Sequence, residues 1–147
     1  MSGADRQGGF TLIELLAVML IIALMASLAV SWLPRTGRAR LEAVALEAAA
    51  LLRRERTYAI LSGREHEIVL DGERRALVAD SGGVVAIPRD VSLDILGADE
   101  RRFGRRLVAS FHSDGASSGA VLKLSQEKAS YEVKVNWYTG GVTVVSP

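Results

Sequence analysis

The stretch Gly9-Phe10-Thr11-Leu12-Ile13-Glu14-Leu15-Leu16 opens an apolar run that extends to Leu33, and residues 15–33 include no charged side chain. A helix of the 24 residues from Phe10 to the end of the run would be about 36 Å long, which exceeds a hydrocarbon core of about 30 Å. The run therefore predicts a membrane-spanning helix. Glu14 is the exception, because a carboxylate inside such a helix costs about 2.5–3.5 kcal/mol.

The order Gly9, Phe10, Glu14 and then unbroken apolar residues resembles the processing site of type IV pilins and type II secretion pseudopilins. The resemblance implies that prepilin peptidase cuts between Gly9 and Phe10 and that Phe10 is then N-methylated. It also implies that Glu14 pairs with the amino terminus of a neighbouring subunit when subunits stack into a filament.

Elementary electrostatics leaves two interpretations of Glu14. A carboxylate near the membrane edge can reach the lipid headgroups. Alternatively, the carboxylate and a cationic amine face each other in an apolar bundle and satisfy charges that neither could carry alone. The offsets of Gly9 and Phe10 favour the second interpretation.

The chain of 147 residues has room for one modest domain besides the anchor. From Pro34 onward it holds 17 Lys and Arg against 15 Asp and Glu, and this balance disfavours a dedicated nucleic-acid-binding domain. The chain has no cysteine, which excludes a disulfide framework and a thiolate metal site.

The first nine residues are too short and too polar for an ordinary secretory signal, so we expect residues 1–9 to be a cleaved leader. Arg35, Arg38 and Arg40 follow the apolar run. By the positive-inside rule they would place the C-terminal part in the cytoplasm. The processing motif places it in the periplasm, and we follow the motif because an enzyme reads the leader.

A second helical segment is expected after Pro34, which lacks a backbone donor and should kink the helix. Apolar residues recur at three- and four-residue steps across residues 38–61, and Ser62-Gly63 is a plausible stop. If Pro34 only kinks the helix, residues 10–62 form one element of 53 residues. The apolar stripe comprises Leu41, Val44, Ala45, Ala48, Leu51, Leu52 and Ala59.

The cluster Arg53, Arg54 and Arg56, interleaved with Glu55, is interpreted as a solvated helix face rather than a nucleic-acid patch. From Arg64 onward the pattern alternates, which predicts short strands. The clearest strand covers residues 131–137, and residues 98–106 are expected to form a charged loop. The other strands are expected at residues 68–70, 76–78, 84–87, 91–95, 107–111, 120–124 and 142–145.

These elements predict an α+β fold in which the helix stripe is buried by two small antiparallel sheets. The family resemblance implies a pilin-like fold, with the first half of the long helix in the membrane. The expected parts are a leader at 1–9, a transmembrane and filament-core helix at 10–33, an amphipathic continuation at 34–62 and a periplasmic β domain at 63–147.

The C-terminal half narrows the resemblance. Phe111-x-x-Asp114-Gly115-x-Ser117-Ser118, followed by a strand and then Trp137-x-Thr139-Gly140-x-Val142, resembles the H-type minor pseudopilin and the FimT/FimU group of minor pilins. Family members often carry Pro before the Asp-Gly pair and Ser after it, where this chain has Ser113 and Ala116. From the residues alone, Asp114-Gly115 is a tight turn, and Trp137 is expected in the core.

The residues His112, Asp114, Ser117 and Ser118 raise the possibility of a hydrolase. Neighbours along one turn do not readily converge into a triad, and the sequence has no Gly-x-Ser-x-Gly elbow, so no catalytic site is expected. His66 and His112 are expected in unrelated strands, so neither a metal nor another cofactor is expected.

We therefore expect a single-pass protein of the bacterial inner membrane that is incorporated into a pseudopilus. The resemblance implies membrane lipid, prepilin peptidase, the assembly platform, and the other minor and major pseudopilins as partners. The alternative is a type IV minor pilin that acts in pilus initiation or DNA uptake. A DNA-binding version would need a basic track, for which Arg101, Arg102, Arg105 and Arg106 are the candidates.

Overall fold

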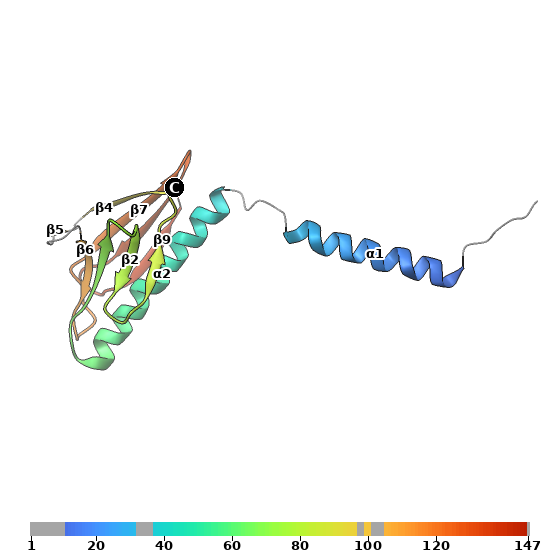
Figure 1. Cartoon of the computed structure of the whole chain (residues 1–147). Coiled ribbons are helices and arrows are strands. Elements are labelled where there is room, and N and C mark those ends of the chain that lie inside the picture. The colour runs from blue at the N-terminus through green and yellow to red at the C-terminus, as the bar shows by residue number, and fades with distance from the viewer. Residues whose placement is uncertain (1–10, 32–36, 97–98, 101–104, 147) are drawn as a thin grey trace, which may run out of the picture. The chain divides into compact units, whose positions relative to one another are not determined.

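The structure is a computed structural model that describes residues 11–31, 37–96, 99–100 and 105–146 (Figure 1). The chain divides into two compact units, Met1–Pro34 and Arg35–Pro147. The first unit contains helix α1, and the second contains helix α2 and the nine strands found among the described residues.

Helix α1 (Leu12–Ser31) carries Glu14 in its first turn, and the side chains described for residues 12–27 are all exposed. The N–H groups of Glu14 and Leu15 donate to the Thr11 carbonyl at 3.1 and 3.3 Å, which closes the first turn. In the part of the chain that the structure describes, no helix has the length and sustained hydropathy of a membrane span. Pro34 and the expected continuity of one long helix lie outside the described residues.

Helix α2 (Gly37–Ser62) ends where the sequence predicts. Gly63 takes a φ of +66°, and its N–H donates to the Ala59 carbonyl at 3.0 Å, as expected for a helix stop at glycine. The buried face of α2 contains every member of the predicted stripe and two further residues, Ala49 and Glu55.

The strands form two antiparallel sheets. The five-stranded sheet has the order β3-β2-β1-β6-β5, with β1 (His66–Asp71), β2 (Ala76–Ala79), β3 (Val84–Ala86), β5 (Asp99–Glu100) and β6 (Arg105–Phe111). The four-stranded sheet has the order β4-β7-β8-β9, with β4 (Ser92–Leu96), β7 (Ala120–Gln126), β8 (Ala129–Val135) and β9 (Val142–Val145). The expected α+β class with two antiparallel sheets is confirmed.

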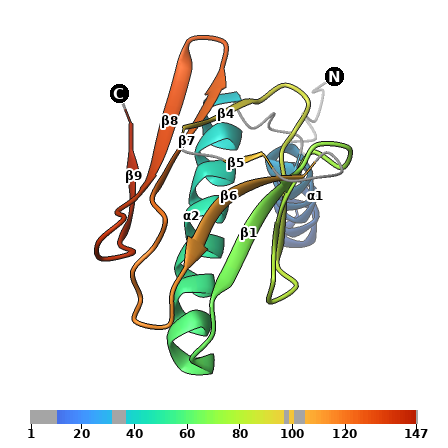
Figure 2. The same cartoon turned by 90° about the vertical axis from the view of Figure 1, so that its left-hand side faces the viewer.

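Helix α2 contacts strands of both sheets. One continuous hydrophobic core contains side chains from the helix and from both sheets. Figure 2 shows α2 behind the strands, with β7, β8 and β9 on one side and β1 and β6 on the other. Leu52 of α2, Phe111 of β6 and Leu122 of β7 are all fully buried in this core. Complete burial of each such side chain stabilises a fold by about 1.5–3 kcal/mol. Because these side chains come from the helix and from both sheets, the apolar face of α2 holds the two sheets together.

Two expectations about the strands are wrong. The segment 98–106, expected to be a loop, contains the short strand β5 and the first two residues of β6. Asp99 pairs with Leu107 and Glu100 with Arg106, because antiparallel pairing requires only backbone groups and tolerates charged side chains at a sheet edge. The alternating segment 131–137 belongs to β8 only as far as Val135.

Strand β9 is an edge strand of the four-stranded sheet and lies beside α2. The carbonyl of Val142 accepts a hydrogen bond from Nη2 of Arg53 at 2.9 Å. Arg53 is predicted on a solvated face, but its guanidinium also donates a hydrogen bond to a backbone carbonyl on this edge.

Candidate functional site at the junction of the two sheets

The segment between β6 and β7 carries the chain from the five-stranded sheet to the four-stranded sheet and contains much of the turn motif. Ser118 ties this segment back to β6. Its N–H donates to the carbonyl of Ser110, and its hydroxyl oxygen accepts the N–H of Ser110, both at 3.0 Å. One serine thus makes two hydrogen bonds to a strand of the sheet that the chain has just left.

Asp114 and Gly115 form the tight turn that the sequence predicts. The Oδ1 atom of Asp114 accepts the N–H of Ala116 at 2.9 Å, and Gly115 has a φ of +86°. The N–H of His112 donates to the Ala116 carbonyl at 2.9 Å. Asp114 therefore stabilises its own backbone turn, which is a common role of aspartate before glycine.

Ser117 connects this turn to the loop between β8 and β9. Its N–H donates to the Trp137 carbonyl at 3.0 Å, and its hydroxyl donates to the Asn136 carbonyl at 3.2 Å. Gly140 has a φ of +63°, and a Cβ built there would overlap the carbonyl oxygen of Gly115. The two loops can approach this closely only because residue 140 lacks a side chain.

Arg56 of α2 completes the arrangement. Its Nε atom donates to the Gly115 carbonyl at 3.1 Å, and its Cδ atom would lie 3.0 Å from a Cβ at Gly140. We call Arg56, Gly115, Ser117, Ser118 and Gly140 the junction, because they connect α2 to both sheets. Most residues of the predicted turn motif thus lie at the junction. Arg56 lies at the junction too, although the sequence predicts it on a solvated face.

Trp137 contributes only its backbone to the junction, and the expectation that its ring is in the core is wrong. The side chain is 70% exposed. The alternation of β8 ends at Val135, and the next residue, Asn136, begins a turn in which its Oδ1 atom accepts the N–H groups of Tyr138 and Thr139, both at 2.9 Å. The turn leaves the indole outside the core.

The Ser, His and Asp side chains near the turn are each engaged separately. The hydroxyl of Ser117 donates to a backbone carbonyl, the carboxylate of Asp114 accepts a backbone N–H, and Nδ1 of His112 lies 3.6 Å from Glu65. A nucleophile triad requires the imidazole between the hydroxyl and the carboxylate. The contacts of Ser117 and Asp114 instead serve backbone geometry.

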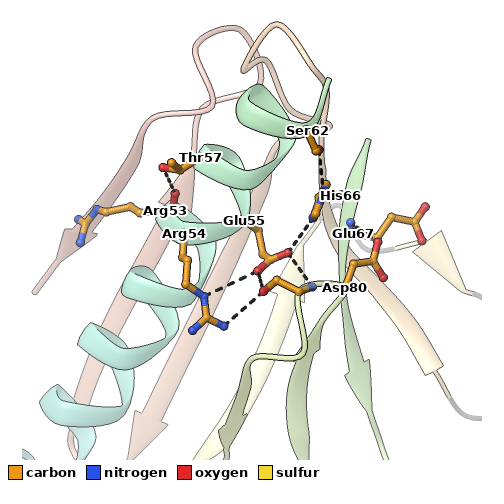
Figure 3. A network of polar contacts seen from close by, with 9 residues as sticks. Arg53, Arg54, Glu55, Thr57, Ser62, His66, Glu67 and Asp80 are labelled. Atoms are coloured by element: carbon orange, nitrogen blue, oxygen red, sulfur yellow. Dashed lines mark hydrogen bonds and ion pairs between the residues drawn. The ribbon is translucent and has the colours of Figure 1, made fainter. Parts of the chain in front are cut away.

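A second polar cluster surrounds Glu55, and the sequence-based prediction that this residue lies on a solvated face is wrong. Glu55 is fully buried. Figure 3 shows its carboxylate at the centre of a network of polar contacts. Its Oε2 atom lies 3.2 Å from Nδ1 of His66 and accepts the N–H of Ser81 at 3.2 Å, while its Oε1 atom accepts the Ser81 hydroxyl. Nε of Arg54 lies 3.9 Å from the same carboxylate. A buried carboxylate needs such partners, because burying it without them costs several kcal/mol.

The Glu55 cluster connects α2 to the five-stranded sheet. His66 begins β1, and Ser81 lies between β2 and β3. A Cβ at Gly83 would overlap the guanidinium of Arg54, so this glycine leaves room for the arginine. The signal was present in the sequence, because Glu55 lies four residues after Leu51 and four before Ala59 and therefore continues the apolar stripe.

The same cluster contains a hydroxyl, an imidazole and a carboxylate in series. The Oγ atom of Ser62 lies 3.1 Å from Nε2 of His66, whose Nδ1 contacts Glu55. Ser62 is the last residue of α2, where the helix presents unpaired carbonyls. An oxyanion needs N–H donors, so this helix end is unsuited to stabilising one. The imidazole also stacks on Tyr58, with ring centroids 6.2 Å apart, so we assign the series to packing.

The expectation that the two histidines lie on unrelated strands is wrong. His66 pairs with Phe111, the residue before His112, because β1 and β6 are neighbours. Within the described ranges, no three His, Cys, Asp or Glu side chains are grouped so that they could hold a metal ion.

The remaining predicted residues are placed in part. Gly9 and Phe10 lie outside the described residues, and Glu14 lies in the first turn of α1. Arg101 and Arg102 also lie outside them. Arg105 and Arg106 are exposed at the start of β6, opposite Asp71 and Leu70 in the pairing with β1.

Residues 5–30 match the Prokaryotic N-terminal methylation motif. Over 138 residues the chain is 33% identical to Type II secretion system protein H of Xanthomonas campestris pv. campestris, and the match covers 91% of this chain and 80% of that protein. The chain belongs to the type II secretion system protein H family. The H-type pseudopilin resemblance of residues 9–14 and 111–142 is therefore confirmed.

Two solved structures resemble this family member in fold. The minor pseudopilin EpsH from the type II secretion system of Vibrio cholerae superposes with a TM-score of 0.61 at 16% identity, over 76% of this chain and 97% of that one. The type IV minor pilin FimU of Pseudomonas aeruginosa gives 0.54 at 16% identity, over 78% and 97%. At such identities the likeness concerns the fold alone, and it confirms the pilin-like fold.

The close approach of the two loops at the junction predicts that a side chain at residue 140 destabilises the domain. We expect Gly140→Ala to lower the free energy of unfolding of residues 35–147 by at least about 3 kcal/mol, because a Cβ there collides with Gly115 in addition to the backbone strain. Gly63→Ala is the matched control, since Gly63 has nearly the same φ with nothing within 4 Å of the added Cβ, and should cost about 1–2 kcal/mol. Urea unfolding measures both, and equal losses would contradict the proposed close approach.

The Glu55 cluster gives a second prediction. Glu55→Gln should lower the free energy of unfolding by about 1–3 kcal/mol, because one carboxylate oxygen that accepts a hydrogen bond is replaced by an NH₂ group. Glu47→Gln on the same helix is the control, because Glu47 is exposed, and should change it by less than about 0.5 kcal/mol. Similar urea midpoints for the two variants would mean that the cluster contributes little.

Proposed function

We propose that this chain is a minor pseudopilin of the type II secretion system, a structural subunit at or near the tip of the pseudopilus. In this role it supports the export of folded proteins across the outer membrane. The observation that carries the proposal is the 33% identity to a type II secretion protein H over 91% of the chain. The fold likeness to EpsH agrees with it.

The N-terminal segment would supply the anchor and the assembly signal. We propose that residues 1–9 are removed by prepilin peptidase, that Phe10 becomes the N-methylated terminus, and that residues 10–33 form the transmembrane and then filament-core helix. Support comes from the match to the N-terminal methylation motif and from the lack of charged residues between Leu15 and Leu33. Glu14 would set axial register by pairing with the terminal amine of a neighbouring subunit.

The C-terminal unit would lie in the periplasm and present surfaces to other pseudopilins. Residues 34–62 would continue the helix beneath the β domain at 63–147. The junction supports this structural role, because its side chains hold turns and sheets together rather than converging on an open reaction centre. The major pseudopilin, other minor pseudopilins and the assembly platform would be the partners.

A minor pilin of the type IV pilus is the second candidate, since FimU shares the fold. A version that takes up DNA would require an exposed basic track. Arg105 and Arg106 are exposed at the start of β6, and Arg105 lies opposite Asp71 of β1. An acidic residue opposite one of the two arginines weakens a phosphate-binding interpretation.

A deletion of the gene in the native host tests the main proposal. We expect secreted enzymes to accumulate in the periplasm while surface pili and DNA uptake stay normal. Complementation with the intact gene controls for effects on neighbouring genes. Normal secretion together with lost pili or lost transformation would instead assign the protein to the type IV pilus.

The role of Glu14 predicts a separation of processing from assembly. Glu14→Leu should be cleaved as efficiently as the wild type, because the cut lies before Phe10, but incorporation into sheared pseudopili should fall at least about tenfold, equivalent to about 1.4 kcal/mol of lost pairing. Immunoblots of membrane and filament fractions measure both. Gly9→Ala is the control that should leave uncut precursor in the membrane. Wild-type incorporation of Glu14→Leu would refute the proposed register contact.

A further inference from the structure

The loop between β8 and β9 holds two large aromatic side chains out of the core. Trp137 is 70% exposed and Tyr138 is 73% exposed, and their rings lie edge to face with centroids 5.7 Å apart. The loop is fixed, because Asn136 accepts two of its N–H groups and Ser117 donates to it. Two adjacent exposed aromatic residues on a fixed loop provide contact area at low entropic cost, which is typical of a binding surface.

Arg56 lies beside these aromatics with most of its hydrogen-bonding capacity unused. Its Nε atom binds the Gly115 carbonyl, which fixes the orientation of the guanidinium. In the part of the chain that the structure describes, its two Nη groups make no hydrogen bond and no carboxylate lies within ion-pair distance of it. Arg56, Trp137 and Tyr138 line the same surface hollow, together with His112, Asp114 and Thr139.

The other ionisable side chains around the hollow already have partners. The carboxylate of Asp114 accepts the N–H of Ala116, and His112 lies 3.6 Å from Glu65. The guanidinium of Arg56 is the group around the hollow whose Nη donors remain available to a ligand. Mixed charge of this kind does not fit a chain of phosphates, which requires several cations in line. It fits one carboxylate, for which a guanidinium provides two parallel donors.

The hollow also lies toward the C-terminal end of α2, which ends at Ser62. Arg56 lies 19 residues after Gly37, so it is about 28 Å along α2 from the residue where the helix begins. Subunits of a filament contact their neighbours through heterologous surfaces, in which different patches of the two subunits meet. Tryptophan, tyrosine and arginine are the residue types that contribute most to such interfaces.

We propose that Arg56, Trp137 and Tyr138 form the docking surface for a polypeptide segment of a neighbouring pseudopilus subunit. That segment places a carboxylate against the Nη groups of Arg56 and an apolar side chain against the aromatic pair. This inference rests on the proposed function, because it needs a filament neighbour, and it adds the residues through which the β domain meets that neighbour.

Photocrosslinking of the full-length chain in the deletion host tests the surface. Tyr138 is replaced by the photoreactive amino acid p-benzoylphenylalanine, and Val84 on β3, whose side chain is 62% exposed, is the control position. On irradiation we expect an adduct with another pseudopilin from position 138 and none from position 84. Addition of Arg56→Gln, which removes the charge, should lower the yield of the adduct at least about tenfold.

Because Arg56 also binds Gly115, a second variant isolates the surface from the junction. Trp137→Ala removes an exposed ring, so the melting temperature of residues 35–147 should change by less than about 2 °C. The same change should lower the adduct yield at least about fivefold and reduce secretion. Val84→Ala is its control and should leave the adduct from position 138 unchanged.

The proposed docking surface would be refuted by equal adducts from both positions, or by no adduct in cells that process the chain. A nuclease-sensitive adduct, which would indicate nucleic acid, would also refute it. Wild-type secretion by Trp137→Ala would do the same. Failure of the proposed function is recognised separately, because the gene deletion would then leave secretion intact. A secretion defect on deletion without an adduct from position 138 refutes the surface and leaves the function standing.

Discussion

The whole C-terminal unit depends on one helix that has to be covered by two sheets. An amphipathic helix under a single sheet buries one stripe, whereas α2 contacts strands of both sheets and buries a wider face. Much of that face is alanine, and Ala45, Ala48, Ala49 and Ala59 are all fully buried. Small side chains let the strands approach the helix closely, and the leucines between them fill the remaining space.

The constraint explains why two consecutive residues of α2, the buried Glu55 and the half-buried Arg56, contact the rest of the domain through polar side chains. A face that is wide enough for two sheets includes positions whose neighbours are loops and strand ends, where backbone groups lack partners. Glu55 meets Ser81 and His66 at the five-stranded sheet, and Arg56 meets Gly115 where the chain crosses to the four-stranded sheet. Consecutive residues of one helix therefore fix the helix against different parts of the domain, and the sheets are held in place by directional contacts as well as by apolar burial.

The sequence was sufficient for the features that depend on local periodicity. The three- and four-residue spacing located α2, the alternation located most strands, and Gly63 and Asp114-Gly115 marked a helix end and a turn through their backbone preferences. Features set by tertiary context were not accessible in this way. The charge of Glu55 predicts a solvated position although its spacing continues the apolar stripe, and alternation alone does not show that β8 ends before Trp137. The contact of Arg56 with Gly115 joins residues that are 59 positions apart, and no local pattern in the sequence indicates it.

The contact between Arg53 and the carbonyl of Val142 also affects how copies of the domain can meet. An edge strand with free backbone groups is a template for strand addition, and densely packed copies with such edges tend to aggregate. A guanidinium on one of those groups blocks continuous backbone pairing along β9, because an incoming strand would have to displace it. Neighbouring domains are therefore discouraged from merging into a shared sheet at this edge.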